Sequence, residues 1–205
     1  MKPAFLTFAL ALLLPTPVMA DGVLARQLHY VGETRVGALT APITIDLDIG
    51  EQRQSVTRVL IDEHVRNRDL GTAEVTLNRG GVVPGYGAHL TFEEETLLDM
   101  LALQFENCTG LSTGDQWERS GELLAGVHKT HYDVRAINGD WLDMHIARTI
   151  EFHDGSHGSL SGMMRYNSSS VVPRWIDFSG EYVGFQGGPS PLQISAQLTA
   201  DSFQP

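Results

Sequence analysis

The chain has 205 residues and a formal net charge of −11 at pH 7. This acidic balance disfavours nucleic acids and anionic membrane surfaces as partners, because both bind cationic protein surfaces. The one cysteine, Cys108, excludes an internal disulfide, and we expect it to be a buried small apolar residue.

The first 20 residues have the organisation of a secretory signal. Lys2 precedes an apolar run that is too short to span a bilayer, and Val18-Met19-Ala20 forms a small-x-small cleavage site. We therefore predict a protein exported to the bacterial periplasm or the extracellular space. Residues 21–205 are expected to form one domain without stable membrane insertion, because no later apolar run is long enough to span a bilayer.

Strand-like alternation dominates the rest of the chain. Apolar and polar residues alternate with a period of two, and Gly, Pro, Asn and Asp lie between the runs. The runs are "ITIDLDI" (43–49), "SVTRVLIDEHV" (55–65), "TAEVTL" (72–77) and "PLQISAQLTA" (191–200). The pattern predicts an antiparallel β protein.

One segment, residues 91–107, has helical rather than strand periodicity. It begins with acidic residues, as helix N-termini prefer, and Leu97, Leu98, Leu101 and Phe105 fall on one side. We predict a mainly β fold, with a single curved antiparallel sheet, either a half-barrel or an open barrel, and this one helix packed against its concave side.

Residues 114–184 resemble a class of exported bacterial β-meander domains of uncharacterised function. The resemblance rests on "GDQW", a G-D-x-W strand, followed by "HYDVRAINGDWLDM", "GSLSGMMRYN" and "DFSGEYVG". It implies a long antiparallel meander and assigns no catalytic residue.

Residues 128–137 and 141–152 are expected to form a hairpin. A two-residue Asn138-Gly139 loop would mix charged with apolar groups on one face, whereas a three-residue loop ending at Asp140 separates them. The second register predicts the pairs Ala136–Leu142, Arg135–Asp143, Val134–Met144, Asp133–His145 and Tyr132–Ile146.

The stretch "FHDGSHG" (152–158) can be either a tight turn or half of a metal site. A three-residue loop of Asp154, Gly155 and Ser156 places His153 opposite His157, and it pairs Ile150 with Leu160. Two exposed histidines are too few for a closed metal site. We favour the turn and predict no metal site.

Arg148 is the one charged residue on the predicted apolar face. It would face Thr130 on one neighbouring strand and Gly162 on the other. Three interpretations remain: a side chain that reaches solvent near a sheet end, a ligand contact at the polar end of a cavity, or a partner of a buried carboxylate from the helix.

The leading functional hypothesis is an exported, non-catalytic protein that binds an apolar or anionic amphiphilic small molecule between sheet and helix. No cofactor is expected, and protein partners are not specified by the sequence. The predicted ligand-binding residues are Arg148, His128, Tyr132, Met144, Tyr166 and Met164, with Met163 as an alternative to Met164.

Two other classes stay open. "GSLSG" has Leu160 where a hydrolase nucleophile elbow has serine, and no H-E-x-x-H occurs, so no catalytic residue is predicted. A secreted hydrolase would have to use a histidine-based site that these motifs do not reveal. The third class is a scaffold protein with a solid core and an exposed sheet edge.

Overall fold

The computed structural model describes residues 26–50, 56–66, 68–79, 81–85, 89–106, 108, 110–123, 126–184 and 187–203. The predicted signal sequence lies outside these residues. The strands are β1 (Arg26–Val36), β2 (Leu39–Ile49), β3 (Val56–Val65), β4 (Arg68–Asn78), β5 (Gly81–Pro84), β6 (Gln116–Leu123), β7 (Gly126–Asn138), β8 (Trp141–Phe152), β9 (His157–Asn167), β10 (Val172–Val183) and β11 (Pro189–Phe203). Helix α1 (Phe92–Leu101) continues into a 3-10 turn, η1 (Ala102–Phe105). Among the described residues, no helix has the length and apolar character needed to cross a membrane.

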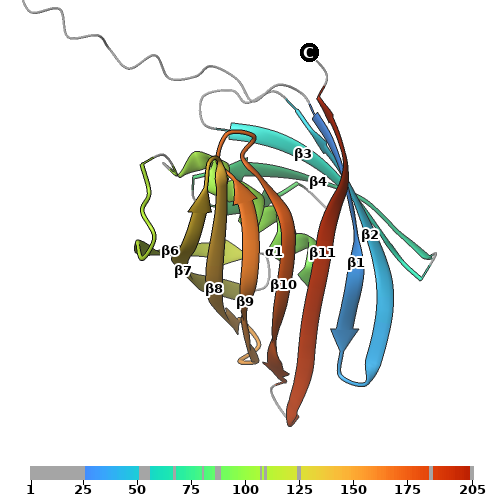
Figure 1. Cartoon of the computed structure of the whole chain (residues 1–205). Coiled ribbons are helices and arrows are strands. Elements are labelled where there is room, and N and C mark those ends of the chain that lie inside the picture. Colours follow the sequence, from blue (N-terminus) through green and yellow to red (C-terminus); the bar gives the residue numbers. More distant parts are fainter. Residues whose placement is uncertain are drawn as a thin grey trace, which may run out of the picture.

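The strands form one antiparallel sheet, and this confirms the predicted fold class. Their order is β5-β4-β3-β2-β1-β11-β10-β9-β8-β7-β6, so every paired neighbour except β1–β11 is also consecutive in the chain. The sheet curves until β5 and β6, its first and last strands, come into contact. The result is a nearly closed barrel (Figure 1).

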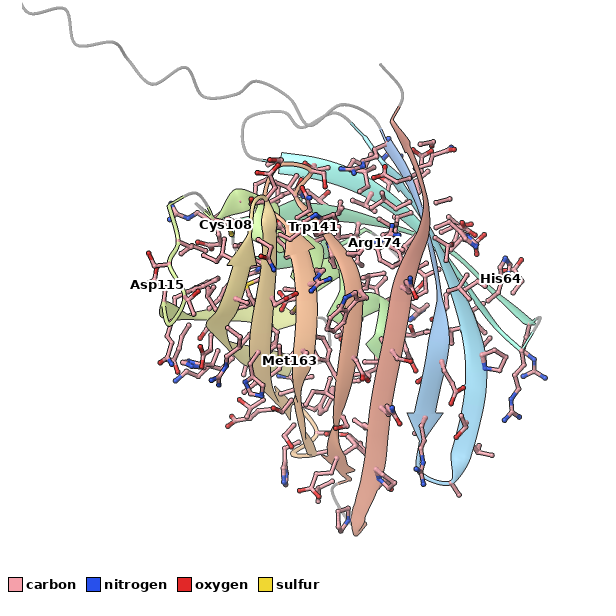
Figure 2. All side chains as sticks on the ribbon, in the orientation of Figure 1. His64, Cys108, Asp115, Trp141, Met163 and Arg174 are labelled. Carbon is pink, nitrogen blue, oxygen red and sulfur yellow. The ribbon has the colours of Figure 1, made fainter. Side chains whose placement is uncertain are left out.

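Alternation along each strand separates the interior of this barrel from its outer face. In β2, the apolar residues from Ala41 to Ile49 are buried at every second position, whereas Asp46 and Asp48 are exposed. In β9, Met164 is fully buried, whereas the neighbouring Met163 is partly exposed (Figure 2). The period-two pattern in the sequence therefore reports which side chains enter the core.

The β7–β8 hairpin confirms most of the predicted register and corrects its end. The pairs Val134–Met144, Asp133–His145 and Tyr132–Ile146 form as predicted. A bulge between Val134 and Ala136 then places Ala136 opposite Asp143 and Ile137 opposite Leu142, so the predicted pairs Ala136–Leu142 and Arg135–Asp143 are wrong. The turn has two residues, Gly139 and Asp140, and Gly139 takes a φ of 59°. An extra residue in one strand is what a β-bulge accommodates, so the shorter turn and the correct faces coexist.

The predicted β8–β9 register is wrong by two residues. His157 lies opposite Glu151 rather than His153, and Ile150 lies opposite Gly158 rather than Leu160. The turn is centred on Asp154 rather than on Gly155, as the hydrogen bond from Phe152 N–H to the carbonyl of Ser156 shows. Within the turn, Asp154 Oδ1 accepts hydrogen bonds from the backbone N–H and the hydroxyl of Ser156, at 2.8 and 2.5 Å. Side chains alternate with a period of two, so the shift leaves every residue on its predicted face.

The same shift changes the neighbours of Arg148. Thr130 lies opposite it on β7, as predicted, but Leu160 rather than Gly162 lies opposite it on β9. Gly162 instead faces Ile146, where an added Cβ would meet the carbonyl oxygen of Asp177 at 2.0 Å. The glycine therefore serves the close approach of β9 to β10, and it is not the residue opposite Arg148.

Helix α1 lies within the curve of the sheet (Figure 1). Thr91 caps it through a capping box with Glu94, so the predicted start is confirmed. The α-helix ends at Leu101 and the 3-10 turn extends to Phe105, whereas Asn107, the predicted end, lies outside the described residues. Every residue from Glu93 to Leu101 is buried, which means that the barrel encloses the helix rather than exposing one of its faces.

Candidate functional site

All six residues predicted to bind a ligand face the interior of the barrel from β7, β8 and β9. Each side chain is at most 3% exposed: Arg148, His128, Tyr132, Met144, Tyr166 and Met164. Four of them are apolar or aromatic and belong to the core, and Arg148 and His128 meet a polar group from α1.

That polar group is the carboxylate of Asp99. Its Oδ1 accepts a hydrogen bond from Arg119 Nη2 at 2.6 Å, and its Oδ2 lies 3.2 Å from Arg148 Nη1. The backbone carbonyl of Asp99 accepts from Arg119 Nη1 at 3.2 Å. A carboxylate from the helix is therefore a partner of Arg148, as the third interpretation of this residue predicted. We refer to Asp99, Arg119, Arg148 and His128 as the interior cluster.

His128 completes the interior cluster as a neutral group. Its Nε2 lies 3.5 Å from Asp99 Oδ1, and its Nδ1 lies 3.2 Å from the hydroxyl of Thr130. Burial disfavours the imidazolium and outweighs the attraction of Asp99, so the pKa of His128 falls to about 4. At neutral pH the two arginines are the only cations of this cluster.

Burial opposes ionisation of Asp99, but Arg148 and Arg119 outweigh it and hold the pKa of Asp99 below its usual value. Glu95, one helical turn earlier, has a raised pKa because burial outweighs the attraction of Arg148. Within the interior cluster as defined, two guanidinium groups therefore face one carboxylate, and the charge balance of these four residues is positive.

Several buried donors near Asp99 have no hydrogen-bond partner among the described residues. They are Nε and Nη2 of Arg148, Nε of Arg119 and the hydroxyl of Tyr132. Each such group costs about 1–3 kcal/mol when it is left unpaired away from water. The interior cluster is therefore suited to an additional acceptor, most of all an anion.

The G-D-x-W segment supports this region structurally. Gly114, with a φ of 94°, donates to the carbonyl of Val134, whose own N–H donates to Asp115. Trp117 then stacks on Tyr132 with ring centroids 5.0 Å apart and planes 10° apart. The motif thus fixes the β6–β7 register and one wall of the interior.

Sequence reasoning missed Asp99 and Arg119. Trp117 and Arg119 are two residues apart on β6, so a strand that buries one points the other to the same face. Asp99 lies between Leu98 and Met100, and apolar neighbours on both sides are the available signal for an enclosed helix.

Helix α1 is also held by polar contacts at its N-terminal end. The hydroxyl of Thr91 donates to Glu63 Oε2 at 2.5 Å, and the hydroxyl of Thr34 donates to Glu93. Burial raises the pKa values of Glu63 and Glu94 to about 7. The contacts that hold the N-terminal end of α1 therefore include carboxyl groups that ionise near neutral pH.

A second histidine site lies on the outer face. Ser161 Oγ lies 3.0 Å from His145 Nε2 in an exposed position. Asp133 lies opposite His145 in the ladder, but its carboxylate pairs with Arg135 at 2.8 Å and Gln116 at 3.2 Å. Cys108 is buried as predicted, and burial raises the pKa of its thiol to about 11, which makes it a poor nucleophile.

Comparison with protein-family models, with curated proteins and with solved structures finds no match for this chain.

Proposed function

We propose that the chain is an exported, non-catalytic binding protein that holds a small anionic amphiphile between the sheet and α1. One observation carries the proposal. Arg148 is 2% exposed, yet its Nε and Nη2 have no hydrogen-bond partner among the described residues. A carboxylate or phosphate can accept from two nitrogens of one guanidinium in a forked geometry, and it would offset the positive balance of the interior cluster.

The apolar part of the ligand would contact the core wall next to Arg148. Met144 and Met164 lie opposite each other on β8 and β9, and Tyr132 lies on β7. Methionine side chains adapt to irregular apolar shapes, which suits a flexible acyl chain better than a rigid ring system.

Helix α1 is the element that would move to admit the ligand. It occupies the inside of the curved sheet, and its attachments include the polar contacts of Asp99, Glu93 and Thr91. Buried polar contacts of this kind contribute little net stability compared with apolar packing of the same volume. A ligand anion that accepts from Nε and Nη2 of Arg148 would leave the contact of Nη1 with Asp99 in place.

Export agrees with this proposal. The amino-terminal 20 residues predict a secretory signal, and the resemblance of residues 114–184 is to exported bacterial domains. A carrier with an enclosed site would keep an amphiphile away from water in the periplasm or outside the cell.

The test is titration of the purified protein with a fluorescent fatty acid, together with native mass spectrometry for a co-purifying lipid. Arg148→Lys keeps the positive charge beside Asp99 but removes the forked donors. We expect it to weaken binding by about 2–3 kcal/mol, the range for losing a hydrogen bond to a charged group.

Arg165→Lys is the matched control, because Arg165 pairs with Asp143 on the outer face and is 40% exposed. We expect this variant to bind as the wild type does. Equal affinity of Arg148→Lys and wild type, with both folded, would remove the basis of the proposal.

A second candidate function, a hydrolase, is favoured by the contact between Ser161 and His145. Its test is hydrolysis of a nitrophenyl ester by the wild type and by Ser161→Ala. Turnover that disappears in Ser161→Ala would support an enzyme, and equal rates would dismiss it.

A further inference from the structure

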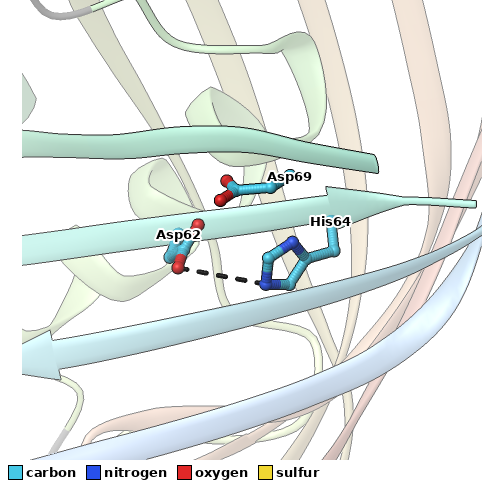
Figure 3. Close-up of side chains that lie close together, drawn as sticks. All are labelled: Asp62, His64 and Asp69. Atoms are coloured by element: carbon cyan, nitrogen blue, oxygen red, sulfur yellow. Dashed lines mark ion pairs between the residues drawn. The ribbon is translucent and has the colours of Figure 1, made fainter. Parts of the chain in front are cut away.

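Three metal-ligating side chains converge on the outer face of β3 and β4 (Figure 3). They are Asp62 and His64 from β3 and Asp69 from β4, and we refer to them as the outer cluster. One candidate ligand atom from each lies within 4.8 Å of the other two, and His64 Nε2 lies 4.0 Å from Asp62 Oδ2. Figure 2 shows His64 on the side of the sheet away from the helix.

The strand geometry explains why these residues meet. Asp62 and His64 are two positions apart, so both side chains leave β3 on the same face. Asp69 lies directly opposite His64 in the ladder, and the register of β3 against β4 shifts between Asp62 and His64. The three ligands therefore stand on paired strands rather than on a loop.

Asp62 provides an independent sign that a cation belongs here. Its Oδ1 is buried and has no hydrogen-bond partner among the described residues, although the side chain as a whole is 35% exposed. Asp46 lies directly opposite it on β2, and like charges in that position destabilise a sheet. His29 Nδ1 lies 2.6 Å from Asp46 Oδ1, so Asp46 has a partner, whereas Asp62 Oδ1 has none among the described residues.

A surface hollow of about 590 Å³ adjoins the outer cluster at Asp62, which lines it together with His29 and Asp46. His64 and Asp69 lie outside this lining, and both are at least partly exposed to solvent. A bound ion could therefore keep water in its remaining coordination positions.

We propose that the outer cluster binds one divalent first-row transition metal ion, with Asp62 and Asp69 as oxygen ligands and His64 as the nitrogen ligand. An imidazole with two carboxylates suits zinc, manganese or cobalt, whereas calcium and magnesium prefer all-oxygen sites. Three protein ligands leave coordination positions open, so the ion is exchangeable.

Binding requires a small closure of the cluster. Ligand atoms about 2.1 Å from a tetrahedral zinc ion lie about 3.4 Å from one another. The candidate ligand atoms of the outer cluster are now up to 4.8 Å apart. All three side chains are at least partly exposed, so rotation of the side chains can close this gap without moving the strands.

The test is isothermal titration of the purified full-length protein with Zn²⁺, and of the variants His64→Ala and Asp69→Asn. His131→Ala is the matched control, because His131 is also on the outer face, 3.9 Å from Glu118, and 38% exposed. We expect one equivalent of zinc to bind the wild type and the control equally. His64→Ala should bind about tenfold or more weakly, because it loses the only nitrogen ligand.

Titration with Co²⁺ adds a spectroscopic readout, because a visible absorption band from the bound ion reports its coordination and should disappear in His64→Ala. Titration with Mg²⁺ should give no saturable heat. A dissociation constant for zinc weaker than about 1 mM in the wild type would overturn the proposal. So would zinc binding that persists in His64→Ala but is lost in His153→Ala, since the ion would then lie at the β8–β9 turn.

Discussion

The interior cluster and the outer cluster lie on opposite faces of one sheet, and they differ in charge and in access to water. In the interior cluster no side chain is more than 7% exposed, and cations exceed ionised acids. In the outer cluster acids exceed cations, and Asp62 and His64 are 35% and 38% exposed. Only the outer charges can be screened by solvent and salt.

This difference sets what each cluster can do. A buried charge without a partner costs several kcal/mol, so the interior cluster must keep its ion pairs or receive an anion from outside. An exposed charge costs little, so the outer cluster can persist with or without a bound cation. The interior cluster is therefore coupled to the folding of the barrel, and the outer cluster is coupled to the metal content of its surroundings.

The largest contrast is expected between Asp99→Asn and Asp69→Asn. The first leaves two buried guanidinium groups facing a neutral amide and should lower the free energy of unfolding by about 3–5 kcal/mol. The second changes an exposed side chain whose Oδ1 accepts from the backbone of Gly71, a bond that asparagine can also make. It should change stability by about 0.5 kcal/mol or less. Urea unfolding of both variants measures the contrast, and similar losses would show that the Asp99 carboxylate is not needed to pair the two buried arginines.

The next largest effect is expected for Arg148→Met. Asp99 would keep Arg119 as a partner but lose Arg148, and we expect a loss of about 2–3 kcal/mol. Arg165→Met removes an exposed arginine and should cost about 1 kcal/mol or less. Thermal unfolding of both variants separates them. If Arg148→Met were more stable than the wild type, the free-energy cost of burying Arg148 would exceed the stabilisation from its pairing with Asp99.

Two carboxyl groups at the N-terminal end of α1 should make the stability of the protein depend on pH. In the folded protein the pKa values of Glu63 and Glu94 are about 7, whereas the ordinary pKa of a glutamate, which we take for the unfolded chain, is 4.5. The folded state then binds extra protons between these pH values, so the free energy of unfolding should fall as the pH rises from 4.5 to 7. The fall should be about 2–3 kcal/mol from each group.

Glu63→Gln is the variant that tests this dependence. It should remove about one group's share of the fall, because the amide oxygen still accepts from Thr91 but does not ionise. Glu74→Gln is the control, since Glu74 is exposed and pairs with Arg58 on the outer face. Unfolding curves between pH 5 and 8 give the comparison, and a Glu63→Gln profile that matches the wild type would contradict the assignment.

Most of the fold follows from the period-two pattern, and the errors have a local cause. The faces of β8 and β9, and of β7 as far as Val134, were predicted because alternation continues through these stretches, whereas the predicted face of Ala136 is wrong. The bulge at Arg135 was missed because a bulge has no mark in composition, and the end of β7 can form a plausible ladder in either register. The β8–β9 turn was predicted one residue too far along the chain, because the hydrogen bonds of Ser156 to Asp154 belong to local geometry that spacing does not record.

The interior cluster was half predictable. Arg148 could be identified because a charge on an apolar strand face needs a partner or a path to water. Its partner could not be singled out, because α1 carries four acids, Glu93, Glu94, Glu95 and Asp99, and the sequence does not show which of them the sheet brings to Arg148. Only the enclosure of α1 by the sheet makes Asp99 a core residue. The outer cluster could not be assembled, because the meeting of Asp62 with Asp69 depends on the exact pairing of β3 with β4.

The smallest effect, and the one that separates the two clusters most directly, is expected for Asp62→Asn. Without added metal this change removes a carboxylate opposite Asp46 and should stabilise the protein by about 0.5 kcal/mol, the size of a like-charge cross-strand pair. With excess zinc the order should reverse, because the wild type gains binding free energy in its folded state and the variant loses one ligand. Thermal unfolding of both proteins in chelator and in zinc measures the four values. A destabilised Asp62→Asn in chelator would show that the Asp62 carboxylate is already satisfied, and equal stabilisation of both proteins by zinc would place the ion away from Asp62.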